Sequence, residues 1–251
     1  MFKFPIQQII DNESIPDERE KDVDYWHPSS FGGCARGVYL ERKGVPCPIP
    51  FDARTYRIFE LGHVIEDIVA KKLIKAAKKE PYNFKVEYQK PIIIEKWKIR
   101  GTLDLKISMP EGDIIYDIKS INSRKFHYMR QRGGADKHYL QQVWLYMYAE
   151  NCQEGRILYV SKDDQFMAEY PLFLTDKTIS KPIIEKIKML NACWESNILP
   201  PPAETFIEEG GKKVVNWQAK YCRYHSICLE DKDWLNKALK EINNDKYARK
   251  N

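Results

Sequence analysis

The longest regular pattern of apolar positions in the chain is helical. Between Thr55 and Lys79 the apolar residues recur every three or four positions, which predicts an amphipathic helix. From Phe84 to Ile118 the pattern changes to β-branched and aromatic residues, which predicts three or four strands, with the last two joined as a hairpin. The helical positions are Ile58, Leu61, Ile65, Ile68, Val69 and Leu73.

Weaker patterns follow in the rest of the chain. The opening segment is charged and aperiodic, and a short helix ending at Gly44 is predicted within FGGCARGVYLERKG. Further helices are predicted at about 136–150 and 178–195, with a strand or a pair of strands between them in RILYVSKDDQFMAEYPLFL. This order favours an α/β fold with a mixed central sheet flanked by helices. We expect a single domain over residues 1–251, with a flexible tail at 240–251.

Composition predicts the cellular compartment of the protein more than its function. The net charge is +5, but 36 acidic residues accompany 41 basic ones, so charge alone predicts no polyanionic partner. The N-terminus lacks the apolar run of a signal peptide, and no stretch reaches the roughly 18 to 20 apolar residues of a membrane span. We therefore expect an intracellular, cytoplasmic protein with no membrane role, whose cysteines lie in a reducing compartment.

Candidate chemistry gathers on the predicted hairpin. Asp104 lies on the polar face of one strand, and Asp117 and Lys119 share a face of the next. A turn centred on positions 110–111 places Asp104 opposite Asp117, whereas a turn centred on 111–112 places it opposite Lys119. Both registers bring the three side chains to one face.

Such a face can hold a cation. Two neighbouring carboxylates repel each other unless a cation or a proton lies between them. Mg²⁺ favours one or two carboxylates with waters and a phosphate oxygen, so Asp104 and Asp117, with the Ile118 carbonyl, are suitable ligands. Lys119 can stabilise developing charge or assist deprotonation of a water. The alternative is an ordinary half-solvated hairpin, in which charged and apolar residues also alternate.

Two predicted helices carry further candidates. Glu66 adjoins the apolar stripe of the first helix, so its carboxylate either points at the sheet or lies on the surface. In the later helix Gln142 and Tyr146 share one face with Tyr139. Aromatic core packing around one buried amide gives the same pattern.

In this order the segments resemble the RecB-like branch of the PD-(D/E)xK nucleases, which includes CRISPR-associated and phage exonucleases. FELGHVIEDIVAK resembles the first motif, GTLDLKIS and IIYDIKS resemble the motifs that supply an aspartate and D-x-K, and HYLQQVWLYMYA resembles the QxxxY element. The resemblance covers most of the chain and implies a restriction-endonuclease-like core whose N- and C-terminal segments pack together.

The same resemblance implies an activity and roles for the residues. It implies a Mg²⁺- or Mn²⁺-dependent deoxyribonuclease, most often an exonuclease, in DNA recombination, repair, or phage or CRISPR DNA processing, in a bacterial, archaeal or phage-infected cell. The implied catalytic residues are Glu66, Asp104 and Asp117 with the Ile118 carbonyl as metal ligands, His63 as a further metal contact, Lys119 acting on the water, and Gln142 and Tyr146 positioning the substrate.

The cysteines extend the resemblance. Many RecB-like relatives hold an iron-sulfur cluster with one N-terminal cysteine and a C-terminal C-x2-C-x5-C group, and PSSFGGCARGVYLERKG and WQAKYCRYHSIC resemble these segments. Cys34, Cys222 and Cys228 match three ligands, but Ala219 stands at the fourth position, whereas a [4Fe-4S] cluster normally takes four cysteines. His225 is a substitute ligand, and these residues can alternatively hold Zn²⁺ or be simple buried thiols. The cysteine-bearing subdomain would comprise residues 26–50 and 193–230.

DNA is the expected partner. Basic and aromatic residues that follow the second hairpin strand can grip phosphates and stack on bases, or can form an ordinary solvated loop. The sequence contains no G-x-x-x-x-G-K-[ST] loop, so an unwinding motor would be a separate helicase or recombinase partner. Alternative functions are a non-catalytic DNA-binding subunit of a recombination or repair complex and an accessory protein built around the cysteine site. The candidate DNA contacts are Arg124, Lys125, His127, Tyr128, Arg130 and Arg132.

Overall fold

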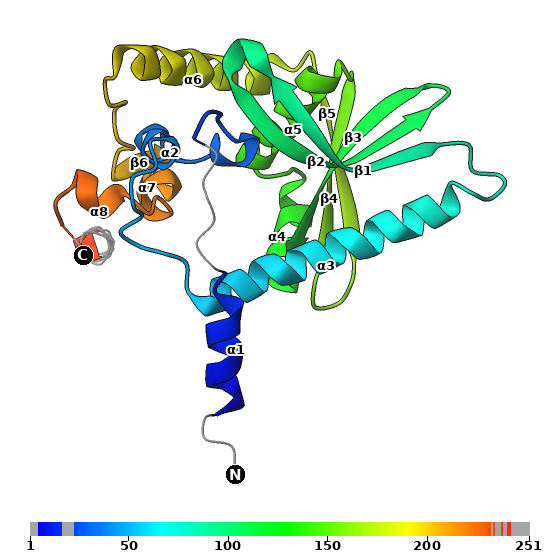
Figure 1. Ribbon diagram of the computed structural model, residues 1–251, viewed down its shortest axis with the longest axis horizontal. Coiled ribbons are helices and arrows are strands. Elements are labelled where there is room, and N and C mark those ends of the chain that lie inside the picture. The colour runs from blue at the N-terminus through cyan, green and yellow to red at the C-terminus, as the bar shows by residue number, and fades with distance from the viewer. Residues whose placement is uncertain (1–4, 17–22, 232, 234–236, 238–239, 242–251) are drawn as a thin grey trace. The chain divides into compact units, whose positions relative to one another are not determined.

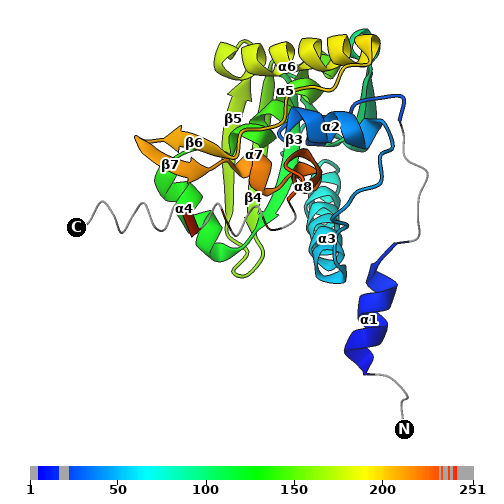
Figure 2. The same cartoon turned by 90° about the vertical axis from the view of Figure 1, so that its left-hand side faces the viewer.

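The computed structural model describes residues 5–16, 23–231, 233, 237, 240 and 241, which form two units. Residues 242–251 of the predicted tail lie outside the described part of the chain. Figures 1 and 2 show the ribbon from two directions. Unit 1 contains the described residues of Met1–Glu20, His27–Ser29 and Phe51–Ile183, and unit 2 contains those of Lys21–Trp26, Ser30–Pro50 and Ile184–Asn251.

Unit 1 is built on a five-stranded mixed sheet with the strand order β1-β2-β3-β4-β5. The first three strands form an antiparallel meander, β3 and β4 pair in parallel, and β5 returns antiparallel to β4. The prediction of a mixed central sheet flanked by helices is confirmed. The strands are β1 (Lys85–Ile94), β2 (Ile99–Met109), β3 (Gly112–Ile121), β4 (Glu154–Ser161) and β5 (Met167–Phe173).

Helix α3 (Ala53–Ala76) covers one face of this sheet and is the long cyan helix in Figure 1. Asp52 begins it by accepting a hydrogen bond from the Thr55 backbone N–H at 2.8 Å, which satisfies one of the unpaired donors of the first turn. Ile65, Val69 and Leu73 of the apolar stripe predicted from the sequence pack against side chains of β2, β3 and β4. The other three predicted positions, Ile58, Leu61 and Ile68, are exposed. The buried residues of the cluster are Ile65, Val69, Ala70, Leu105, Ile118, Leu158 and Val160.

Helix α5 (Lys137–Glu150) packs against the opposite face, where a glycine allows a close approach. A Cβ atom at Gly155 of β4 would lie 2.5 Å from Met147 Sδ and 2.6 Å from Val143 Cγ1, both on α5. Because such distances are shorter than any carbon contact allows, α5 sits at this depth only while residue 155 lacks a side chain. The depth of α5 sets the position of Gln142 and Tyr146 on the same helix.

Several elements of unit 1 differ from the sequence prediction. The opening segment, expected to be aperiodic, contains α1 (Ile6–Ser14), and Arg57 of α3 bonds to Asp11 of this helix. The basic segment after β3 is a helix, α4 (Ser123–Arg132), rather than a loop. Unit 1 also contains the first two residues of the short helix η1 (Pro28–Ser30), the short helix η2 (Glu95–Trp97) and the first residues of α6 (Lys177–Ser196).

Unit 2 brings together segments that are distant in the sequence. Arg42 of α2 (Ala35–Arg42) stacks between Trp26 and Trp194, with its guanidinium carbon 4.2 Å and 4.0 Å from their ring centroids. Trp26 Nε1 donates a 2.7 Å hydrogen bond to Asn191 Oδ1 on α6. The unit also contains β6 (Phe206–Glu209), β7 (Lys212–Val215), α7 (Trp217–Lys220) and α8 (His225–Cys228). The hairpin of β6 and β7 was not predicted from the sequence.

Among the described residues, no helix has both the length and the apolar character that crossing a membrane requires.

The close approach at Gly155 generates a stability prediction. Gly155→Ala should lower the free energy of unfolding by about 1–3 kcal/mol, because the added methyl group must displace Val143 and Met147. The measurement is urea unfolding followed by circular dichroism. Gly134→Ala is the matched control, because a Cβ atom there meets nothing within 4 Å and should leave stability nearly unchanged. Equal effects of the two substitutions would contradict the prediction.

Candidate active site

The hairpin of β2 and β3 brings the predicted acidic residues together. Leu105 pairs with Tyr116 and Met109 pairs with Gly112, which is the register that places Asp104 opposite Asp117. The ladder ends at the pair of Leu105 and Tyr116, one position before the two aspartates. Instead of a strand partner, the backbone N–H of Ile118 donates to Asp104 Oδ2 at 2.8 Å.

Asp117 and Lys119 form an ion pair inside unit 1. Lys119 Nζ lies 2.9 Å from Asp117 Oδ1 and 2.8 Å from Oδ2. Asp117 is fully buried, and its Oδ2 receives no hydrogen bond of acceptable geometry from the described residues. A buried carboxylate oxygen without a good donor is costly, which makes Oδ2 a natural position for an additional cation.

The positive charge near Asp104, Asp117 and Glu66 is too small to neutralise the three carboxylates. Burial raises the pKa of Asp117 to about 7; Lys119 lowers it, and Asp104 and Glu66 raise it further. Burial likewise raises the pKa of Asp104, and burial together with Asp104 raises the pKa of Glu66. Burial alone would lower the pKa of Lys119, but Asp117 and Asp104 raise it above its ordinary value. The single Lys119 ammonium group therefore has to offset the charge of three carboxylates.

Glu66 reaches this group from α3. Its side chain is 15% exposed, and its carboxylate senses the charges of Asp104 and Lys119. His63, one turn earlier, is 76% exposed and places Nδ1 3.3 Å from Glu66 Oε2. Glu66 therefore lies beside the hairpin carboxylates rather than on the surface, while His63 is largely exposed and contacts Glu66.

Gln142 and Tyr146 reach the site from α5. Both side chains are buried, and Gln142 Nε2 donates a 3.0 Å hydrogen bond to Tyr146 Oη. Burial raises the pKa of Tyr146, and the charge of Asp117 raises it further, so the phenol lies close to the carboxylates. The two residues thus form a buried polar pair within the electrostatic reach of the site.

Two neighbouring residues had no role predicted from the sequence. The Tyr139 ring centroid lies 5.1 Å from Lys119 Nζ, a cation–π distance. Burial lowers the pKa of His138 to about 4; Asp136 opposes this shift, and Lys125 and Lys119 add to it. The sequence did carry a signal for Tyr139, because this residue precedes Gln142 by three positions on the same helical face. No sequence pattern distinguished His138.

Helix α4 carries the candidate DNA contacts and divides them into two groups. Lys125 Nζ lies 2.9 Å from Asp136 Oδ2, and Arg132 Nη2 lies 3.0 Å from Asp136 Oδ1, so both cations bind the residue that precedes α5. The second group consists of exposed side chains on α4, with Tyr128 61% exposed. Its members are Arg124, Tyr128 and Arg130, and the ring of His127 lies 3.6 Å from Asp164 Oδ2.

The donor set suits a hard divalent cation with few protein ligands. Among the described residues, no three His, Cys, Asp or Glu side chains are grouped so as to hold a metal ion by themselves. Mg²⁺ does not need such a cage, because it retains waters and binds through one or two carboxylates and a substrate phosphate. Asp104, Asp117 and the Ile118 carbonyl fit that requirement, since Asp117 Oδ2 contacts the Lys119 ammonium but accepts no hydrogen bond from the described residues.

The cysteine group in unit 2 does not fit a four-cysteine cluster. Cys34 is hydrogen-bonded to Cys222, which lowers the pKa of Cys34 to about 5 and raises that of Cys222. Ala219, at the position of the absent fourth cysteine, is fully buried and packs against apolar neighbours. His225 is also buried, and burial lowers its pKa. The apolar neighbours of Ala219 are Ala203, Phe206 and Val215.

Comparisons with known proteins bear on the fold. No family model and no curated protein matches this sequence. The structure is similar to the crystal structure of SSO0001, with a TM-score of 0.51 and 18% identity over 90% of this chain and 98% of that one. It is also similar to an alkaline exonuclease, LHK-Exo, from Laribacter hongkongensis, with a TM-score of 0.51 and 13% identity over 70% of this chain and 90% of that one.

The chain has a restriction-endonuclease-like fold. At these low identities the likeness concerns the arrangement of the sheet and its helices. The roles of the individual residues stay predictions that depend on the geometry above.

The repulsion between the carboxylates predicts an unusual effect of substitution on stability. Asp104→Asn keeps an oxygen for the Ile118 N–H and removes one charge beside Asp117. In EDTA at pH 8 we expect this variant to have a free energy of unfolding about 1 kcal/mol higher than that of the unmodified protein. Its melting temperature should rise by a few degrees. Thermal unfolding followed by circular dichroism measures the difference.

The stability of the metal-free protein should also depend on pH. The pKa of Asp117 is about 7 in the folded protein and about 4 when unfolded, so the folded state binds more protons between these values. The free energy of unfolding of the metal-free protein should therefore fall as pH rises through this window, and less steeply in Asp104→Asn. Asp113→Asn is the control, because Lys106 lowers the pKa of Asp113 and its removal should not raise stability. A variant Asp104→Asn that unfolds earlier would show that the repulsion is negligible.

Proposed function

We propose that this protein is a metal-dependent deoxyribonuclease, acting as an exonuclease, that hydrolyses phosphodiester bonds at the hairpin of β2 and β3. The observation that carries the proposal is the group of three carboxylates with raised pKa values around one half-buried lysine, Lys119. Such a group is electrostatically incomplete without a cation. The fold it shares with LHK-Exo, an alkaline exonuclease, supports the same reaction class.

Asp104 and Asp117, with the Ile118 carbonyl, would hold Mg²⁺ or Mn²⁺. The metal would supply a Lewis acid for a phosphate oxygen and would lower the pKa of a bound water. The protein fixes these ligands before any cation binds, because the Ile118 N–H holds Asp104 and the Lys119 ammonium holds Asp117. Little rearrangement is then required when a cation enters.

Lys119 would stabilise negative charge rather than accept a proton. Its pKa lies above the ordinary value, so the ammonium keeps its proton at any pH at which DNA is cleaved. The ion pair with Asp117 and the ring of Tyr139 hold the side chain in place. A fixed ammonium beside the scissile phosphate would lower the energy of the transition state, where that phosphate carries additional charge.

Glu66 is the carboxylate that can exchange protons with solvent. It is the most accessible of the three, and burial and Asp104 raise its pKa. A raised pKa makes it a stronger base than an ordinary glutamate, so it can orient the attacking water or accept its proton. Gln142 and Tyr146 would position the substrate phosphate from α5.

The exposed residues of α4 would contact the DNA backbone and bases. Arg124 and Arg130 are exposed cations, and Tyr128 presents a ring on which a base can stack. Lys125 and Arg132 would instead fix the junction of α4 and α5 through Asp136. A separate helicase or recombinase would supply duplex unwinding where the biological process requires it.

The central test is cleavage of labelled DNA. We expect linear DNA to be degraded with Mg²⁺ or Mn²⁺ and to stay intact in EDTA, while closed circular DNA persists. Lys119→Ala and Glu66→Gln should each reduce the rate by at least about 100-fold, because each removes a charge placed at the reacting phosphate or water. Single- and double-stranded substrates labelled at either end would report polarity and strand preference.

Glu60→Gln is the matched control for Glu66→Gln. Glu60 is exposed on the same helix, so its substitution should leave cleavage unchanged. A Lys119→Ala protein that is folded and fully active would overturn the site. DNA binding with no cleavage under any metal would favour a non-catalytic DNA-binding subunit, and cleavage of closed circles would show endonucleolytic action.

A second prediction concerns DNA affinity. The double variant Arg124→Ala, Arg130→Ala should weaken binding of uncleaved DNA in EDTA and reduce the dependence of log Kd on log salt by about one per lost phosphate contact. Fluorescence anisotropy at several salt concentrations measures both quantities. The control pair Lys96→Ala, Lys98→Ala removes the same charge from the η2 region and should change the affinity less. An equal loss in the two proteins would refute a specific role for α4.

A further inference from the structure

Cys34 occupies a polar environment at the start of α2 in unit 2. Its side chain is 3% exposed and accepts a hydrogen bond from the Ala203 backbone N–H, with 3.2 Å between nitrogen and sulfur. Cys34 is the N-cap residue of α2, where the positive end of the helix dipole favours negative charge. These features stabilise a sulfur that carries negative charge and distinguish Cys34 from an ordinary buried thiol.

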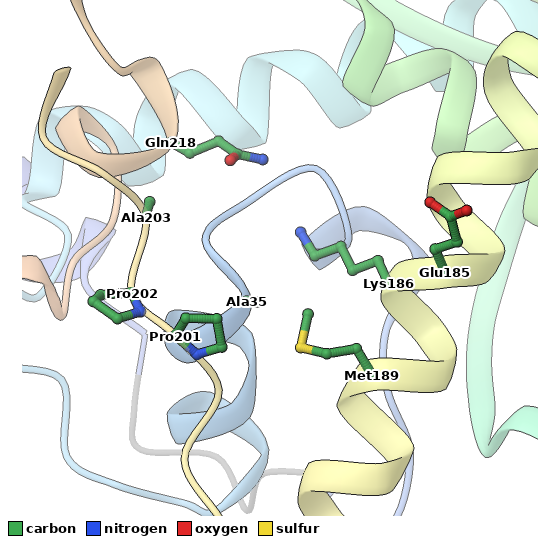
Figure 3. A pocket seen from close by; sticks show the side chains of 8 residues that line it. All are labelled: Ala35, Glu185, Lys186, Met189, Pro201, Pro202, Ala203 and Gln218. Atoms are coloured by element: carbon green, nitrogen blue, oxygen red, sulfur yellow. The ribbon is translucent and has the colours of Figure 1, made fainter. Parts of the chain in front are cut away.

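A pocket of about 450 Å³ lies next to this cysteine. Figure 3 shows that Lys186 of α6 points into it toward the loop before α2, with Gln218 of α7 on another wall. Lys186 Nζ donates to the carbonyls of Phe31, at 2.5 Å, and Gly33, and its charge lies within the electrostatic reach of Cys34. Ala35 and Ala203, the chain neighbour and the hydrogen-bond donor of Cys34, also line the pocket.

The second sulfur comes from the other end of the chain. The Cys222 thiol is hydrogen-bonded to Cys34 and is partly exposed. Helix α2 passes so close that a Cβ atom at Gly37 would lie 2.8 Å from Cys222 Sγ and 3.8 Å from Cys34 Cβ. The two cysteines are free thiols, and the packing of α2 against the segment between α7 and α8 places them near each other.

We propose that Cys34 and Cys222 are an oxidisable dithiol, a modification site that a small hydroperoxide converts into a disulfide. The proximity of the two cysteines around Gly37 and the pocket beside Cys34 carry this inference, and the activity proposed for unit 1 plays no part in it. Ala219 adds support, because its methyl group stands where a four-cysteine cluster would need a ligand and leaves the two thiols available to each other.

The chemistry balances in two steps with hydrogen peroxide as the oxidant. The Cys34 thiolate attacks one peroxide oxygen, so that the O–O bond breaks, an S–O bond forms and hydroxide leaves. The Cys222 sulfur then attacks the Cys34 sulfenic acid, so that the S–O bond breaks and an S–S bond forms, and water leaves with the Cys222 proton. The pair of thiols loses two electrons in total, and the peroxide is reduced to two waters.

The disulfide would join the start of α2 to the C-terminal segment of unit 2. Cys34 and Cys222 are separated by about three-quarters of the chain, so the link would close a very large loop of the unfolded chain. Closing such a loop restricts the unfolded chain and stabilises the folded state. Oxidation would therefore raise the thermal stability of the protein, and a reductant would reverse the change.

The test uses the full chain, purified with reductant, freed of it, and treated with a small excess of hydrogen peroxide. Remaining thiols are alkylated, and the protein is digested without reduction and analysed by mass spectrometry. We expect a Cys34–Cys222 linked peptide, a loss of two free thiols and a higher Tm, all reversed by dithiothreitol and unchanged in Cys47→Ser. Cys47 is the control because it lies in unit 2 and bonds to the Ile49 carbonyl.

Cys34→Ser should form neither the disulfide nor a sulfenic acid at this site, and Cys222→Ser tests the same step if Cys34→Ser does not fold. Cys222→Ser should form no disulfide, and its Cys34 sulfenic acid should be captured by dimedone. Unchanged thiols after peroxide treatment, a disulfide between other cysteines, or dimedone capture elsewhere would each overturn the proposal. Iron or zinc that copurifies in stoichiometric amount and is lost in both Cys34→Ser and Cys222→Ser would overturn it as well.

Discussion

The ion pair of Lys119 and Asp117, with Asp104 and Glu66 beside it, is the interaction around which unit 1 is arranged. Taking charged groups out of water is costly, and breaking a buried pair by removing one partner is more costly still. Here the negative charges outnumber the positive one, so the folded protein tolerates an electrostatic excess inside its sheet. The apolar packing of α3 and α5 against the two faces supplies the stability that offsets this excess.

That arrangement also explains why the polar groups come from different elements. The β2–β3 ladder ends before the aspartates, and the Asp104 carboxylate takes the Ile118 N–H that a strand partner would otherwise bind. A side chain that replaces a ladder hydrogen bond is held more firmly than one on a surface loop. Glu66 and the pair of Gln142 and Tyr146 then reach the same place from helices on opposite faces of the sheet.

The elements whose residues follow a regular local periodicity were predicted from the sequence. The periodicity around Ile65 and Val69 identified α3, and the alternation around Asp104 identified the hairpin, although two registers stayed open. Helix α4 was not predicted, because its basic residues mask the apolar pair of Phe126 and Met129. Its boundaries did carry a signal, since Asn122 caps its start and a glycine follows its end.

Other features could not be predicted because they depend on contacts between distant segments. The shortage of positive charge at the site follows from burial, which no sequence pattern reports. The contact of Cys34 with Cys222 depends on the passage of α2 beside the C-terminal segment at Gly37. The depth of α5 similarly depends on the absence of a side chain at Gly155, and an isolated glycine within a strand is equally typical of a bulge or a bend.

The parallel pairing of β3 with β4 has a consequence for the order in which the chain folds. The meander of β1, β2 and β3 can form through neighbouring turns, whereas β4 must wait for the whole connection through α4 and α5 to close. Until then Asp104 and Asp117 stay in contact with water, and their repulsion costs little. The electrostatic penalty therefore falls on the last step of folding, so a cation at this site would act on the rates of final closure and first opening more than on the initial collapse.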